Sequence, residues 1–179
     1  TSTYLTGKFG GINGQIISNG DEVNIEIREE INQKKLPEGL VDYIPKTATL
    51  RVISGPEAYL FNKTVIKTFY TQSMQVTSDI NRIGYRLIGS KLAAKNHNMP
   101  SKSVFKGTVQ VPPSGEPIVI MSDGPTTGGY PRIANIIEAD LDFFAQMRPG
   151  NKIRFKEIDP RGARSVSKLR LQKINELLK

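Results

Sequence analysis

Short apolar runs, bounded by glycine, proline or asparagine, recur along most of the chain. Some alternate apolar with polar residues and others are continuously apolar; both patterns are typical of short β-strands. We predict strands at residues 22–28, 49–54, 73–77, 85–89, 108–111, 117–122, 132–138 and 152–158. Many short strands and few helices indicate a mainly β protein whose sheet closes, or nearly closes, into a β-barrel.

Three segments repeat their apolar residues every three or four positions, which is the spacing of an amphipathic helix. We predict short helices at residues 59–70 and 140–147, with Asp140 placed to cap the second. Residues 32–46 contain two prolines and mixed charge, and are the most linker-like part of the chain. The clearest helix covers residues 160–179, with an apolar stripe made of Val166, Leu169, Ile174, Leu177 and Leu178.

A length of 179 residues is sufficient for a domain with a buried core. We expect the barrel domain to cover residues 1–158 and a basic C-terminal helix to cover residues 159–179. No apolar run is long enough for a membrane span. The absence of cysteine excludes disulfides and thiolate nucleophiles, and it is compatible with the cytoplasm, where we expect the protein to work. A single histidine excludes a multi-histidine metal site, and we expect no metal.

The net charge of +8 is concentrated at one end of the chain. Residues 151–179 hold nine lysines or arginines and three acids, a net +6, which leaves +2 for the other 150 residues. A basic amphipathic helix without interleaved aromatic residues favours a solvated face or a contact between subunits over a nucleic-acid site. We therefore expect no nucleic-acid partner and no membrane partner.

Neither a P-loop nor a dinucleotide-binding glycine motif occurs in the sequence. Any use of ATP therefore requires a site of another kind or a partner subunit. His97 lies in a polar segment, KLAAKNHNMPSK, and we expect an exposed loop histidine there. A general-base role for His97 would need a partner residue that the sequence does not identify.

Arg82 and Arg86 stand four residues apart, with Tyr85 between them. On an extended strand, residues four apart share a face, so both guanidiniums would point in the same direction. Such a pair is costly unless it meets carboxylates, phosphates or solvent. The spacing fits a pair of structural salt bridges and an anion-binding pair equally well.

The segment SDGPTTGGYP, residues 122–131, follows the predicted strand at 117–122 and is rich in hydroxyl groups and glycine. Hydrogen-bonding side chains next to permissive backbone are typical of a site for a polar small molecule. The alternative is a tight loop whose Asp and Thr side chains satisfy their own backbone. The residues that would form the site are Asp123, Thr126, Thr127, Gly128, Gly129 and Tyr130.

Two runs carry a resemblance to a known family. Residues 109–155 read VQVPPSGEPIVIMSDGPTTGGYPRIANIIEADLDFFAQMRPGNKIRF, and residues 81–87 read NRIGYRL. Together with GKFGGINGQIISNGDEV at residues 7–23, they resemble the carboxy-terminal half of the PxpC/KipA family. Members of this family are C-type subunits of 5-oxoprolinase or allophanate hydrolase subunit 2-like proteins, related to the carboxyltransferase region of urea carboxylase.

The resemblance implies a cyclophilin-like closed β-barrel, with short helices and a C-terminal helix. It also implies a part in an ATP-dependent enzyme that opens 5-oxoproline to glutamate, working with A- and B-type partner subunits, the latter KipI-like. In such a site Asp123 would orient a substrate N–H or a water, as the catalytic residue. The substrate-binding residues would be Arg82, Tyr85, Arg86, Gln110, Thr126, Thr127, Gly128, Gly129 and Tyr130.

The sequence also departs from the family's pattern. Gly124 and Pro125 stand where an Arg-Gln pair is usual, and Asn81 stands where an acid is common. The family's amino-terminal half has no counterpart, so we expect a fragment that does not turn over substrate alone. Two other readings remain: a KipA-type regulator that antagonises a KipI-like kinase inhibitor, or a carboxyltransferase-like part of a biotin-dependent urea carboxylase. The urea carboxylase reading would need a biotin-carrier domain on the same chain or nearby, and this sequence contains no biotin-carrier motif.

Overall fold

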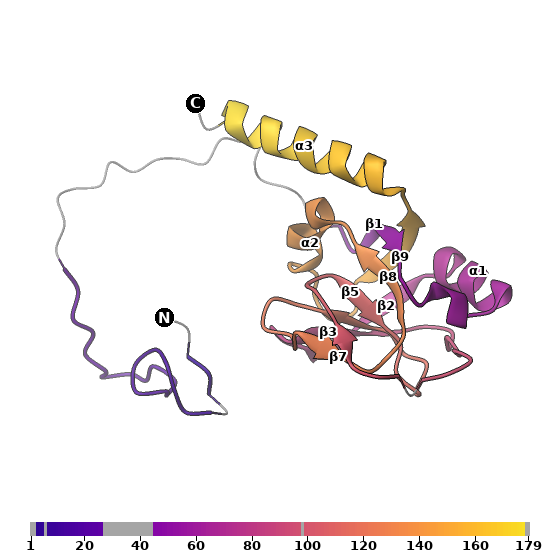
Figure 1. The fold of residues 1–179 in the computed structure, drawn as a ribbon. Coiled ribbons are helices and arrows are strands. Elements are labelled where there is room, and N and C mark those ends of the chain that lie inside the picture. The colour runs from indigo at the N-terminus through magenta and orange to yellow at the C-terminus, as the bar shows by residue number, and fades with distance from the viewer. Residues whose placement is uncertain (1–2, 6, 27–44, 98, 178–179) are drawn as a thin grey trace. The chain divides into compact units, whose positions relative to one another are not determined.

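A computed structural model describes residues 3–5, 7–26, 45–97 and 99–177 (Figure 1). Its internal contacts divide the chain into two units. The first unit is Thr1–Lys35 and the second is Leu36–Lys179. The second unit therefore contains both the barrel and the C-terminal helix. The domain boundary at residues 158/159 stays a prediction.

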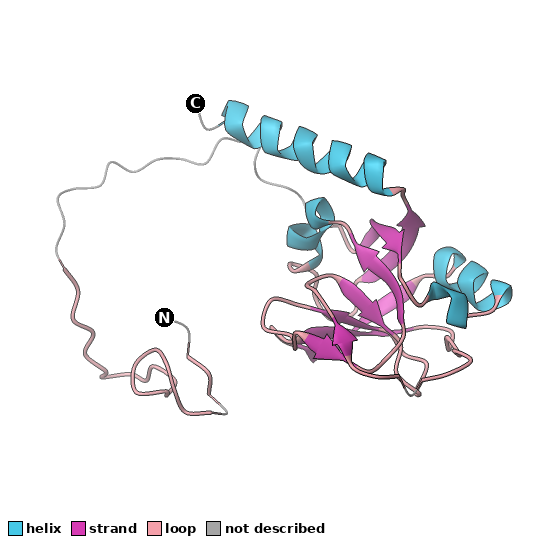
Figure 2. Ribbon diagram, viewed as in Figure 1, coloured by secondary structure: helices cyan, strands magenta, loops and turns pink. Residues whose placement is uncertain are grey.

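Seven strands of the second unit form a closed barrel in the order β1-β8-β5-β6-β3-β2-β9. This confirms the mainly β fold and the closed barrel. Figure 2 shows the strands in magenta and the helices in cyan. A separate two-stranded sheet pairs β4 with β7. The strands are β1 Thr47–Ser54, β2 Met74–Ile80, β3 Gly84–Ile88, β4 Lys102–Ser103, β5 Thr108–Gln110, β6 Ile118–Ile120, β7 Thr127–Gly128, β8 Arg132–Ile136 and β9 Lys152–Glu157.

The barrel closes through β9, which lies between β1 and β2. The β1–β9 pairing is parallel and runs from Thr47 opposite Lys152 to Val52 opposite Glu157. Every other pairing in the barrel is antiparallel. Buried residues alternate with more exposed ones along β1 and β9, as the period of two in their sequences predicts.

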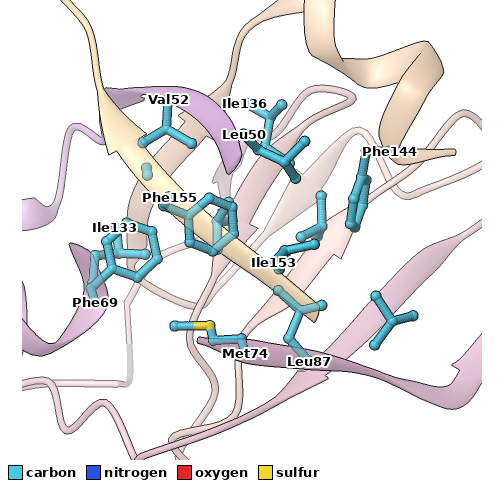
Figure 3. Packing of buried hydrophobic residues seen from close by; sticks show 14 of the residues in the cluster. Leu50, Val52, Phe69, Met74, Leu87, Ile133, Ile136, Phe144, Ile153 and Phe155 are labelled. Atoms are coloured by element: carbon cyan, nitrogen blue, oxygen red, sulfur yellow. The ribbon is translucent and has the colours of Figure 1, made fainter. Parts of the chain in front are cut away.

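The core fills the barrel with aliphatic and aromatic side chains (Figure 3). The rings of Phe69 and Phe155 stack with their centroids 4.7 Å apart. Burying a side chain of this size contributes about 1.5–3 kcal/mol to the free energy of unfolding. The other core residues labelled in the figure are Leu50, Val52, Met74, Leu87, Ile133, Ile136, Phe144 and Ile153.

The helices are the 3-10 helix η2 Ala58–Leu60, α1 Lys63–Thr71, α2 Glu138–Phe144 and α3 Pro160–Leu177. The single helix predicted at 59–70 is divided in two, because the Asn62 side chain accepts a hydrogen bond from the Val65 backbone N–H and so begins α1 anew. The prediction that Asp140 caps α2 is wrong. Ile137 holds the cap position, and Asp140 lies inside the first turn.

The C-terminal helix is confirmed, and the start of its apolar stripe packs against β1 and α2. Ala163 and Val166 pack with Ile137 and Ala139, whereas Leu169 is 64% exposed. The side chains of Leu177 and Leu178 lie outside the described residues. No helix in the described ranges is both long and apolar enough to cross a membrane.

One predicted strand is not formed. Residues 22–26 lie in no strand, and residues 27–28 fall outside the described part of the chain, as does most of the predicted linker at 32–46. The prediction of a strand at residues 22–26 is therefore wrong for this chain. The pairing of β4 with β7 was not predicted, because two residues on each side leave no readable pattern.

Candidate functional site

A cavity of about 310 Å³ opens where β2 ends, β3 begins and the chain leaves β6. Two backbone hydrogen bonds extend the β3–β6 pairing past the strands: Met121 N–H to the Ile83 carbonyl (2.9 Å) and Asp123 N–H to the Arg82 carbonyl (2.8 Å). This extension brings the predicted catalytic residue beside one predicted binding residue. The cavity is lined by Ile80, Asn81, Arg82, Tyr85, Met121, Ser122 and Ala145.

Arg82 and Asp123 form a bidentate ion pair at the cavity. The guanidinium Nε lies 2.6 Å from one carboxylate oxygen of Asp123, and Nη2 lies 2.9 Å from the other. The hydrogen bonds from Arg82 hold the pKa of the Asp123 carboxyl below its usual value. Both side chains are largely exposed, so this pair is within reach of a ligand from solvent.

Arg86 does not share this carboxylate. Its Nε lies 2.9 Å from Asp79 on β2, and Arg86 does not line the cavity. The expectation that the two guanidiniums converge is wrong, because β3 begins at Gly84 and Arg82 lies in the bend before it. Each arginine forms its own salt bridge.

Tyr85 does line the cavity, as part of its wall. Its hydroxyl donates a hydrogen bond of 2.8 Å to the Ala145 carbonyl, just after α2. Its ring packs against Phe144 with a centroid separation of 5.0 Å. The side chain is therefore held at both ends, which gives the cavity one rigid face.

The TTGGYP loop lies on the β4–β7 sheet rather than on this cavity. Thr127 and Gly128 pair with Ser103 and Lys102, and the Thr126 carbonyl accepts a hydrogen bond of 2.9 Å from the Val104 N–H. Thr126, Thr127 and Tyr130 are exposed, and Gly128 and Gly129 are half-buried. Their role in binding a substrate stays a prediction.

The side chain of Gln110 on β5 contacts the backbone of the TTGGYP loop. This side chain is buried and its amide N–H donates a hydrogen bond of 3.3 Å to the Tyr130 carbonyl. A Cβ on Gly128 would lie 2.5 Å from the Gln110 amide nitrogen, so glycine lets the loop backbone approach this side chain.

Glycine is also required just after Asp123. A Cβ on Gly124 would lie 2.4 Å from the Ile120 side chain and 2.9 Å from the Ile83 carbonyl oxygen. The arginine that the family resemblance leads us to expect here therefore does not fit this loop conformation. Gly124 instead keeps Asp123 close to the start of β3.

A buried ion cluster beside the loop has no signal in the sequence pattern. The Glu57 carboxylate is only 2% exposed, and its oxygens lie 2.6 and 2.7 Å from Nε and Nη2 of Arg132 and 3.2 Å from Nζ of Lys102. The hydrogen bonds from Arg132, with a smaller contribution from Lys102, lower the pKa of Glu57 to about 2 despite its burial. Arg132 also donates a hydrogen bond of 2.6 Å to the Ser103 carbonyl. The cluster thus ties β8 to β4, the strand that pairs with the loop.

His97 is half-buried rather than exposed, contrary to the prediction. Its Nε2 accepts a hydrogen bond of 3.3 Å from the Ala94 N–H, and its Nδ1 lies 3.2 Å from the Val111 carbonyl oxygen. These partners assign the proton to Nδ1, because a carbonyl accepts and an N–H donates. His97 connects its loop to the end of β5.

Fold and cavity together define the class: a closed β-barrel domain with a small cavity, lined by apolar and polar side chains, beside the ends of its strands. The chain belongs to the carboxyltransferase domain family, subdomains A and B, whose model matches residues 1–157.

Curated relatives include two bacterial proteins, each named as the C subunit of 5-oxoprolinase. The Haemophilus influenzae protein is 36% identical over 162 residues, which are 88% of this chain and 50% of that protein. The Escherichia coli protein is 38% identical over 160 residues, which are 86% of this chain and 49% of that protein. The chain therefore spans about half the length of these relatives. Urea amidolyase of Saccharomyces cerevisiae is 30% identical over 92% of this chain and 10% of the yeast protein.

Solved structures show the same relationship. The Kluyveromyces lactis urea carboxylase superposes with a TM-score of 0.83 and 26% identity, covering 98% of this chain and 18% of that one. The K. lactis urea amidolyase gives the same TM-score and identity, covering 98% of this chain and 12% of the larger one.

Proposed function

We propose that this chain is a module of an ATP-dependent 5-oxoprolinase, which opens 5-oxoproline to L-glutamate together with A- and B-type partner subunits in the cytoplasm. The observation that carries the proposal is the 36–38% identity to proteins named as the C subunit of 5-oxoprolinase over most of the chain. The KipI-like protein of the family resemblance is the B-type partner in this proposal.

The cavity beside Arg82 offers the groups that 5-oxoproline needs. The substrate carries a carboxylate, a lactam N–H and an apolar ring edge. In our proposal the carboxylate takes the place of Asp123 on the Arg82 guanidinium, because both are carboxylates and the fork of arginine binds either in the same way. Ile80 and Met121 would contact the ring, and Tyr85 would fix its orientation.

Asp123 is the group that this exchange releases. Displaced from Arg82, its carboxylate is free to accept a hydrogen bond from the lactam N–H or from the attacking water. The hydroxyls of Thr126, Thr127 and Tyr130 lie on the neighbouring loop and would act only if a partner subunit or the loop itself closes over the cavity. This sequence of events assigns binding to Arg82 and the catalytic contact to Asp123.

The sequence holds neither a P-loop nor a dinucleotide-binding glycine motif. A triphosphate needs several unpaired cations or converging backbone N–H groups. In and beside the barrel's strands, Arg51, Arg82, Arg86 and Arg132 already bind carboxylates of the chain itself. We derive no step through ATP in this chain and propose that the partner subunits bind it.

The test is reconstitution of the complete protein that contains this chain with its A- and B-type partners. Formation of L-glutamate from 5-oxoproline and ATP is measured with the wild type and with Arg82→Gln. We expect Arg82→Gln to lower kcat/KM by on the order of tenfold or more, because a charged hydrogen bond to the substrate is lost. Lys91→Gln is the matched control: it removes an exposed ion pair of 2.8 Å with Glu116, away from the cavity. No glutamate from the wild-type complex would refute the proposal.

A second candidate function is carboxyl transfer in a biotin-dependent urea carboxylase. The observation that favours it is the TM-score of 0.83 to the K. lactis urea carboxylase. The same reconstituted protein would then consume bicarbonate and ATP in the presence of urea and a biotinylated carrier, and 5-oxoproline would have no effect. Running both assays on one preparation distinguishes the two functions.

A further inference from the structure

Residues 3–5 and 7–26 expose an unusual number of large apolar side chains. Single exposed apolar residues are normal on a protein surface, but a dense group marks a surface that another chain covers. This segment belongs to the smaller compact unit, Thr1–Lys35. The exposed side chains, between 49% and 79% accessible, are Tyr4, Leu5, Phe9, Ile16, Ile17, Val23 and Ile25.

Within this segment, residues 22–26 alternate between polar and apolar side chains in the sequence EVNIE. In an extended chain this alternation places Val23 and Ile25 on one face and Glu22, Asn24 and Glu26 on the other. The pattern is that of a strand with one buried face, yet these residues lie in no strand. A strand forms only against a neighbour that pairs with its backbone.

The strands of the second unit leave little sheet edge that such a segment could extend. The seven barrel strands close on one another, so the barrel sheet has no free edge. The other sheet in the described ranges, β4–β7, pairs only two residues on each side. A second copy of the chain would bring the same closed barrel and the same short sheet.

We propose that residues 21–26 complete the edge of a β-sheet in the half of the family's chain that this one does not span. Val23 and Ile25 then lie on the apolar face of that sheet, and Glu22 and Asn24 face solvent. Two observations point to this partner: the chain covers only about half of its bacterial 5-oxoprolinase relatives, and the matching family model comprises subdomains A and B. Backbone pairing at a sheet edge supplies the affinity, and the alternate side chains supply the register.

Hydrogen exchange of the backbone amides at 21–26 tests this without substrate or ATP. The 179-residue chain is compared with a fusion that joins the unmatched half of the E. coli 5-oxoprolinase relative ahead of Thr1. We expect these amides to exchange at least about a hundredfold more slowly in the fusion, because a paired strand protects them. The inference requires only the family membership, so a failure of the 5-oxoprolinase proposal leaves it standing.

Two matched variants of the fusion locate the contact. Ile25→Asp should return residues 21–26 to fast exchange, because it places a charge on the buried face. Asn24→Asp introduces the same side chain one position away, on the solvent face, and should leave the protection unchanged. The amides of β1 and β9 report whether the barrel stays folded. If Ile25→Asp also releases the barrel, the milder Val23→Thr replaces it, with a partial loss of protection expected.

Three results would overturn the inference. Equal exchange at 21–26 in the chain and the fusion would mean that no strand is completed. Protection in the 179-residue chain at every concentration would place the segment on its own barrel. Protection that rises with the concentration of that chain would assign it to a second copy.

Discussion

Replacing Glu57 by glutamine removes the one negative charge in the buried cluster with Arg132 and Lys102. Glutamine has nearly the same shape, so the change in packing is small and the lost charge dominates. The Arg132 side chain, only 14% exposed, would keep its charge without a counterion. We expect the variant to be strongly destabilised at neutral pH.

The pKa of Glu57 sets the size of the effect. A carboxyl whose pKa falls from 4.5 in the unfolded chain to about 2 in the fold contributes about 3 kcal/mol at neutral pH. Removing one partner of a buried ion pair costs a similar amount, about 3–5 kcal/mol. For a domain of this size, about 3 kcal/mol lowers Tm by roughly 6–12 °C.

Urea denaturation of the wild type and Glu57→Gln between pH 7 and pH 2 measures the effect. A depressed carboxyl pKa stabilises the fold above the unfolded value of 4.5, and this contribution is lost as the pH falls through the folded value of about 2. The difference in free energy of unfolding should therefore be largest at neutral pH and shrink by about 3 kcal/mol towards pH 2. Glutamine does not titrate, so the variant lacks this part of the acid sensitivity.

A difference that stays constant between pH 5 and pH 2, or equal urea midpoints at pH 7, would show that Glu57 does not stabilise the fold through its charge. Glu116→Gln is the control, since it removes the half-buried partner of Lys91 in a bond that is open to solvent. An exposed pair contributes little, so its urea midpoint should stay close to that of the wild type.

Three further outcomes are expected. Asp140→Asn weakens the bonds to the Arg51 guanidinium and backbone N–H, and should cost about 1.5–3 kcal/mol in urea denaturation. Gly55→Ala places a methyl group 2.1 Å from the Arg132 carbonyl oxygen, and should lower the urea midpoint by an amount equivalent to about 1–3 kcal/mol; an unchanged midpoint would show that β1 and β8 can separate there. Asp123→Asn frees Arg82, so steady-state kinetics of the reconstituted complex should show a lower KM for 5-oxoproline together with a lower kcat; a fall in kcat alone would argue against exchange on Arg82.

The periodic pattern predicted most of the barrel because its strands bury one face. The strands at residues 49–54, 85–89 and 152–158 coincide with β1, β3 and β9 to within two residues at each end. The end of β2 was missed: the strand runs three residues past the prediction to Ile80, which pairs with Tyr85 of β3 after an irregularity in the register. The predicted strand at 132–138 ends two residues early, because residue 137 begins the turn into α2.

Contacts that join distant residues were not predictable from one sequence. Glu57 and Arg132 are 75 positions apart, and Arg51 and Asp140 are 89 apart, so no local spacing relates them. The ion pair of Arg82 with Asp123 unites two predicted site residues, but the spacing indicated Arg86 as the neighbour of Arg82. The period of two places two residues on one face only if both lie in the same strand. Arg82 lies before β3 begins, so the period did not apply to it.

The position of β9 has a consequence for the synthesis of the protein. Residues 152–157 fill the gap between β1 and β2, so a nascent chain that ends before them holds every barrel strand but the closing one. Until then β1 and β2 each present an unpaired edge, to which another nascent chain can add. The barrel cannot close until residues about a hundred positions apart come into contact. We therefore expect the barrel to fold slowly, and its unpaired strand edges to need protection at the ribosome.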